Sequence, residues 1–133
     1  MEEKTEEIIR EFLGHSDELT EGIYSELEAT MGRVPFIFPA MSEKKEVFIF
    51  NSLSDLNTAR PKTLDGKTAE IATVAAAAAL GADKCLGVHI VAALKEGVSR
   101  SQILDAILIG AMINKTRSLA ISLKVLEKFS DGE

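Results

Sequence analysis

The sequence predicts an all-α fold of six or seven helices, and three observations support this prediction. Apolar residues recur three and four positions apart along most of the 133 residues. No stretch alternates apolar and polar residues over the length of a strand. The hydrophobic fraction is 46% but the aromatic fraction only 5%, without Trp, which indicates a core of small and aliphatic side chains. We expect one domain over residues 1–133, because this length suits a single core.

Two helices are expected at the start of the chain. The first covers residues 3–13, and Gly14 would end it in the left-handed conformation that commonly follows a helix. The second would be capped by Ser16 or Asp17, since both side chains accept hydrogen bonds from the first free N–H groups. Its apolar residues fall four apart until Gly32, where we expect the helix to stop.

The third helix follows a segment that resists helix formation. Residues 34–41 contain two of the three prolines and predict an extended or turn-rich connection with at most a short helical piece. Ser42 is the expected cap of the helix that follows, and Arg60-Pro61 marks the loop after it. The predicted buried face of this helix consists of Val47, Phe48, Leu53 and Leu56.

Two helices rich in small residues are expected next. Asp65 is the predicted cap of a helix that begins near Gly66 and continues through a run of alanines to residue 80. Asp83 is the predicted cap of a helix over residues 84–96, which Gly97 would end.

Two further helices are expected in the last third of the chain. Ser99 and Gln102 match the capping box, in which each side chain bonds the backbone N–H of the other residue. This box would open a helix through residue 113, and residues 116–129 form a last amphipathic helix.

Charge and cysteine content exclude several classes of function. Fifteen Lys and Arg against twenty-one Asp and Glu give a net charge of -6 without a basic cluster, so no nucleic acid partner is expected. A single cysteine cannot form an intrachain disulfide, and the first ten residues are charged, unlike a signal peptide. The apolar run at residues 71–82 is shorter than the roughly 20 residues that cross a bilayer. We therefore expect a cytoplasmic protein that does not bind membranes.

Cys85 and His89 are the first candidates for chemistry. They lie four residues apart in GADKCLGVH, hence on one face of the helix predicted there. Cys85 would occupy the first turn, where free N–H groups favour a thiolate, and Lys84 adds a cation. The alternative is that both residues pack in a core, since free cysteine is among the most buried residue types. One Cys and two His are too few for a zinc site, so we expect no metal.

Glu70 is the third candidate. It lies in the alanine-rich helix fifteen residues before Cys85, among small apolar side chains. Such a carboxylate either faces solvent or is buried beside a partner. His89 is an available partner.

The run LDGKTAEIATVAAAAALGADKCLGVHIVAALKEGVSRSQILDAI, residues 64–107, resembles the core of the carboxymuconolactone decarboxylase and AhpD-like alkylhydroperoxidase family. The shared features are the LD-x-K-x-x-E start, the C-x-x-x-H centre and the AL-x-x-GVS continuation. The resemblance implies an AhpD-like helical subunit with its family core at residues 64–113. It also implies a homo-oligomer, a trimer or hexamer, and no cofactor.

The peroxidase branch of this family suggests roles for the three candidates. Cys85 resembles its reactive second cysteine, and Glu70 and His89 resemble the relay that takes the thiol proton. The first cysteine of C-x-x-C is replaced by Ala82, and the histidine that often precedes the second cysteine by Lys84. An oxidised Cys85 therefore needs an external thiol, a subunit partner or another redox partner to be reduced.

Three functions are consistent with these observations. The first is a one-cysteine thiol redox protein acting on a hydroperoxide or a disulfide, with peroxiredoxin-like antioxidant activity. The second is decarboxylation of a small carboxylated lactone by His89 and Glu70, with Cys85 as a packing residue. The third is a non-catalytic oligomeric module that binds a redox partner or a small ligand.

Overall fold

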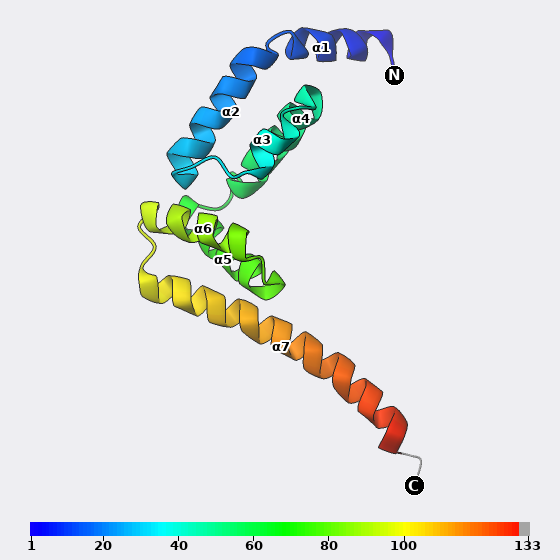
Figure 1. Cartoon of the computed structure of the whole chain (residues 1–133), viewed down its shortest axis with the longest axis vertical. Helices are drawn as coiled ribbons and strands as arrows, with labels where there is room; N and C mark the ends of the chain where they lie inside the picture. Colours follow the sequence, from blue (N-terminus) through cyan, green and yellow to red (C-terminus); the bar gives the residue numbers. More distant parts are fainter. Residues whose placement is uncertain (131–133) are drawn as a thin grey trace. The chain divides into compact units, whose positions relative to one another are not determined.

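The structure is a computed structural model that describes residues 1–130, and it confirms the all-α prediction. Seven helices and no strand occur in this part of the chain (Figure 1). The chain divides into two compact units, Met1–Thr63 and Leu64–Glu133. The single-domain assignment stays a prediction. The helices are α1 (Glu3–Leu13), α2 (Ser16–Met31), α3 (Ile37–Met41), α4 (Lys45–Ala59), α5 (Gly66–Leu80), α6 (Asp83–Lys95) and α7 (Arg100–Ser130).

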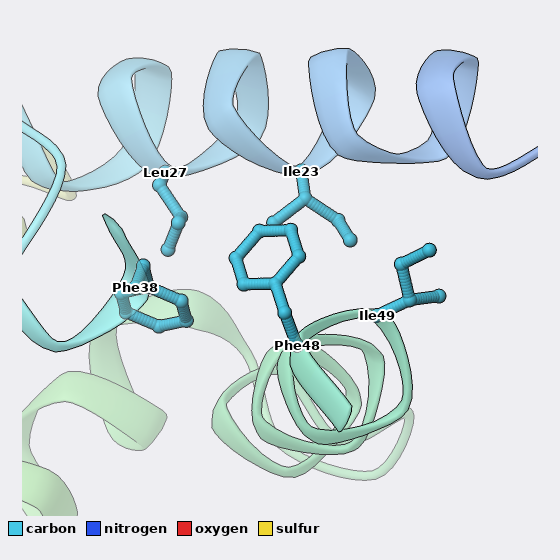
Figure 2. Packing of buried hydrophobic residues seen from close by; sticks show 5 residues of the cluster. All are labelled: Ile23, Leu27, Phe38, Phe48 and Ile49. Atoms are coloured by element: carbon cyan, nitrogen blue, oxygen red, sulfur yellow. The ribbon is translucent and has the colours of Figure 1, made fainter. Parts of the chain in front are cut away.

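The first unit is built on packing of α4 against α2 and the short α3. Phe48 of α4 is fully buried, and Figure 2 shows its ring directed toward Ile23 of α2. The predicted buried face of α4 is partly wrong, because Val47 is exposed and Ile49 lies in the core instead. The core cluster comprises Ile23, Leu27, Phe38, Phe48 and Ile49.

The second unit packs α5 against both α6 and α7. Its core contains more small side chains than that of the first unit, with Val74, Ala93, Val98, Ile103 and Ala106 buried together. The closest approach is at Gly110 of α7, where a β-carbon would meet the backbone of α5 at Ala75 and Ala79. Short side chains therefore let the helix that carries Glu70 pack closely against its neighbour.

Several predicted helix ends are confirmed. The Thr68 N–H donates to Asp65 Oδ1 at 2.8 Å, which caps α5. Ser99 and Gln102 form both hydrogen bonds of the capping box before α7. Gly32 and Gly97 have φ of 74° and 81°, so both adopt the left-handed conformation expected after α2 and α6.

The connection from α1 to α2 differs from the prediction. Gly14 has φ of -59°, a right-handed helical value, and its N–H donates to the carbonyls of Arg10 and Glu11. The chain continues this near-helical path, so the residue before α2 is His15 and no side chain caps the helix. The predicted cap by Ser16 or Asp17 is wrong, because the carbonyl of His15 already accepts a helical hydrogen bond from the Leu19 N–H.

Two other predicted caps are also wrong, because α4 starts later and α6 starts earlier than the sequence predicts. Ser42 ends α3, where its hydroxyl donates to the Pro39 carbonyl, and α4 starts only at Lys45. Asp83 is the first residue of α6, because the carbonyl of Ala82 already accepts the first helical hydrogen bond. Asp83 still places a carboxylate at the positive end of the helix dipole.

The two helices predicted at the end of the chain form one continuous helix, α7. The polar residues near position 115 suggest a break, but this stretch contains no Gly or Pro that would produce one. Asn114 instead turns its side chain toward α5, where its Nδ2 donates to the Ala79 carbonyl at 2.8 Å. That bond satisfies one of the free carbonyls at the end of α5.

Candidate functional site

Glu70 is the most deeply buried ionisable side chain in residues 1–130, with 1% of its surface exposed. It lies five residues after the Asp65 cap, between Ala69 and Ile71 of α5. A carboxylate rarely occupies such a position without a polar partner, because burial removes its hydration. Of the two alternatives for Glu70, a carboxylate facing solvent or one buried beside a partner, the structure shows the buried one.

His89 of α6 contacts this carboxylate. Its Nδ1 lies 2.9 Å from Glu70 Oε2, and its side chain is 16% exposed. An ionised carboxylate only accepts hydrogen bonds, so it holds the imidazole in the tautomer that carries its proton on Nδ1. The pair thus fixes the ring and leaves Nε2 as the nitrogen that can take a proton.

Cys85 lies one helical turn before His89, at the third residue of α6. Its side chain is exposed, and within residues 1–130 its sulfur has no hydrogen bond to His89. The core-packing reading of Cys85 is therefore wrong. The first turn of α6 has free backbone N–H groups, and neighbouring Asp83 and Lys84 bring charges of opposite sign.

Together these residues can perform acid–base chemistry beside an accessible sulfur. Glu70 is buried, His89 is mostly buried, and Cys85 is open to solvent, so solvent exposure increases outward from α5. A histidine held by a carboxylate can accept a proton because the resulting imidazolium is stabilised by that carboxylate. Within residues 1–130, no group of three His, Cys, Asp or Glu side chains is arranged to hold a metal ion.

Two contacts define the start of α5, the helix that carries Glu70. The Thr68 N–H hydrogen bond lowers the pKa of the Asp65 carboxyl below its usual value, which keeps the cap ionised. The Glu96 carboxylate, from the end of α6, lies directly against Gly66, where a β-carbon would clash with it. The sequence analysis missed Glu96, because no local spacing connects residues 30 positions apart.

The model of the carboxymuconolactone decarboxylase family matches residues 49–128, well over half of the chain. The match includes Glu70, Cys85 and His89. Searches of the curated proteins and of the solved structures found no match.

Proposed function

The chain belongs to the carboxymuconolactone decarboxylase family, and on this premise we propose that it is a one-cysteine thiol redox enzyme of the AhpD-like branch. The observation that carries the proposal is the 2.9 Å contact between Glu70 and His89 one turn away from an exposed Cys85. A buried carboxylate that orients a histidine is the arrangement that a general base requires. Family membership alone agrees equally with oxidoreductase and decarboxylase activity.

The first step is oxidation of the thiol. His89 Nε2 takes the proton of Cys85, directly or through a water molecule, and Glu70 stabilises the imidazolium. The thiolate sulfur attacks the outer oxygen of a hydroperoxide, and the O–O bond breaks. The products are a sulfenic acid on Cys85 and an alcohol, whose oxygen receives the proton from His89.

The second step regenerates the thiol. An external thiol displaces water from the sulfenic acid and forms a mixed disulfide with Cys85. A second external thiol then releases the reduced enzyme and leaves as the disulfide of the two reductants. An external reductant is needed because Cys85 is the only cysteine of the chain.

Intact mass analysis after mild peroxide treatment tests this proposal. We expect Cys85 to gain one oxygen atom, and to form a mixed disulfide when a small thiol is added. Glu70→Gln and His89→Gln should each slow the oxidation, roughly 10²-fold for loss of a general base. His15→Gln is the matched control, since His15 is the other histidine and is exposed. An unmodified Cys85, or equal rates in all four proteins, contradicts the proposal.

A second function is favoured by one observation, that the Glu70–His89 contact is complete without the cysteine. His89 and Glu70 could then act as acid and base on a small carboxylated lactone. The bond to the carboxyl carbon breaks, carbon dioxide leaves, and a proton takes its place on the carbon. If ultraviolet absorbance of such a lactone falls with wild type and Cys85→Ala but not with His89→Gln, decarboxylation replaces the redox function. A protein that is inactive in both assays supports the third function, a non-catalytic binding module. The cytoplasmic location stays a prediction.

A further inference from the structure

Glu96 connects the end of α6 to the start of α5. It follows Lys95, the last residue of α6, and its carboxylate lies against Gly66, the first residue of α5. A β-carbon at Gly66 would lie 2.7 Å from the Glu96 carboxyl carbon and 3.0 Å from its Oε1, well inside normal contact. The start of a helix has free N–H groups and a positive partial charge, so a carboxylate is favourable at this place.

Lys67 makes the reciprocal connection, from the start of α5 to the end of α6. Its Cε and Nζ both lie 3.5 Å from the position of a β-carbon on Gly97, the residue that follows Glu96. A cation is favourable at the end of a helix, where the free carbonyl groups carry a negative partial charge. Each of the two helix ends therefore receives a side chain of the favourable charge from the other helix. We call these four residues the end clamp: Gly66, Lys67, Glu96 and Gly97.

The end clamp lies opposite the joint between the two helices. α5 and α6 lie side by side in the second unit and are joined through Gly81 and Ala82 (Figure 1). The clamp connects their other ends, so the pair of helices is held at both ends. Glu70 lies about 6 Å along α5 from Gly66 and about 16 Å from Gly81. It is therefore much closer to the clamp than to the joint.

The contact between Glu70 and His89 is sensitive to the angle between α5 and α6. His89 Nδ1 lies 2.9 Å from Glu70 Oε2, and a hydrogen bond is lost at about 3.5 Å. The contact therefore tolerates only about 0.6 Å of extra separation. At about 16 Å from the joint, this separation corresponds to an opening of about 2° between the helices when the side chains stay fixed.

We propose that Glu96 is a positioning residue that holds α5 and α6 at the angle at which Glu70 contacts His89. Lys67 supports it from the other helix. Glu96 lies 11 residues after Cys85, about 16 Å along the helix, so it acts through the Glu70–His89 pair and not on a reacting atom. The inference rests on the proposed function only in that the pair serves as the base.

Nitrogen-15 NMR of the imidazole rings in the full chain tests the positioning role. The chemical shifts distinguish ring nitrogens with and without a proton, and so give the ratio of the two neutral tautomers of His89. At about pH 9, where histidine is neutral, we expect the Nδ1–H tautomer to dominate in wild type. Glu96→Ala should lower the ratio of Nδ1–H to Nε2–H by roughly two- to five-fold, the effect of one charge at a helix end. Glu96→Gln should lower it less, because the amide oxygen can keep the contact without the charge.

Gly66→Ala is a second, independent variant, since its β-carbon displaces the Glu96 carboxylate and leaves Glu96 itself unchanged. We expect it to lower the His89 tautomer ratio as Glu96→Ala does. Its matched control is Gly22→Ala, where no atom lies within 4 Å of the added carbon. Glu28→Ala is the control for the glutamate, because Glu28 is also exposed at the end of a helix, in the last turn of α2. His15 is exposed and gives an internal reference in every spectrum.

An unchanged His89 tautomer ratio in Glu96→Ala and Gly66→Ala overturns the proposal, provided that far-ultraviolet circular dichroism shows both proteins folded. A wild-type ratio equal to that of His15, or an equal fall in the control variants, also overturns it. Peroxide treatment of the same samples separates this inference from the proposed function. A lowered ratio with an unmodified Cys85 supports the positioning role and contradicts the redox function, whereas an unchanged ratio with an oxidised Cys85 overturns the positioning role alone.

Discussion

Replacing Gly110 with alanine tests the packing of α7 on α5 most directly. The added β-carbon would lie well inside van der Waals contact of the Ala75 carbonyl oxygen, and 3.0 Å from the Ala79 backbone nitrogen. Both atoms belong to the α5 backbone and cannot rotate away, so α7 must move. Overpacking of this kind costs about 3 kcal/mol, the upper end of the usual range. Alanine regains about 1 kcal/mol of helix propensity, so we expect a net loss of about 2 kcal/mol.

Gly87→Ala is the matched control, because Gly87 lies within α6 of the same unit and no atom approaches its β-carbon position within 4 Å. Only the propensity gain remains there, so this variant should be more stable than wild type by up to about 1 kcal/mol. Urea unfolding followed by circular dichroism, at one protein concentration, measures both differences. A Gly110→Ala protein as stable as Gly87→Ala would refute the close approach of the two helices.

Three further predictions concern single sites. Ala82→Cys should form a disulfide with Cys85 on mild oxidation, because residues three apart in a first turn have Cα atoms roughly 5–6 Å apart, and resistance of both thiols to oxidation would contradict this. Asp65→Ala should lower the melting temperature at neutral pH. The folded-state pKa of Asp65 is lowered, so its contribution is present above the usual Asp pKa and lost as pH falls through the folded value. The difference from wild type should therefore shrink as the pH is lowered below the usual Asp pKa, and a constant difference would show that the cap does not titrate. Ser52→Ala should leave urea stability unchanged or raise it by up to about 1 kcal/mol, since the buried Ser52 hydroxyl has no partner in residues 1–130, and a clear loss would reveal a hidden hydrogen bond.

The helix ends show which kind of prediction succeeds from sequence. The Asp65 cap and the Ser99–Gln102 box depend on hydrogen bonds between residues three apart, so a short window of sequence contains the whole interaction. The predicted left-handed Gly14 is wrong because helical hydrogen bonds continue through this residue, and the predicted Asp83 cap is wrong because Ala82 already accepts a helical hydrogen bond, which moves the start of α6 by one residue. At such a helix end, either of two adjacent residues can begin the helix, and amino-acid composition does not decide between them.

One part of the candidate site could likewise be predicted from local spacing, whereas the contacts between helices could not. The four-residue spacing of Cys85 and His89 was readable directly, because a helix places such residues on one face. The contact of His89 with Glu70, and that of Glu96 with Gly66, join different helices. Nothing within either helix specifies these distances.

The sequence by itself determined the helical class, the family and the identity of the three candidate residues, because these depend on periodicity and on short motifs. Only the tertiary structure decided that Glu70 is buried against His89 while Cys85 faces solvent. It also decided that α7 is one helix with an uncovered apolar side. The physical reason is that burial depends on which surfaces of separate helices meet. Small residues such as Gly110 allow two helices to pack closely, but the local hydrophobic pattern does not show this contact.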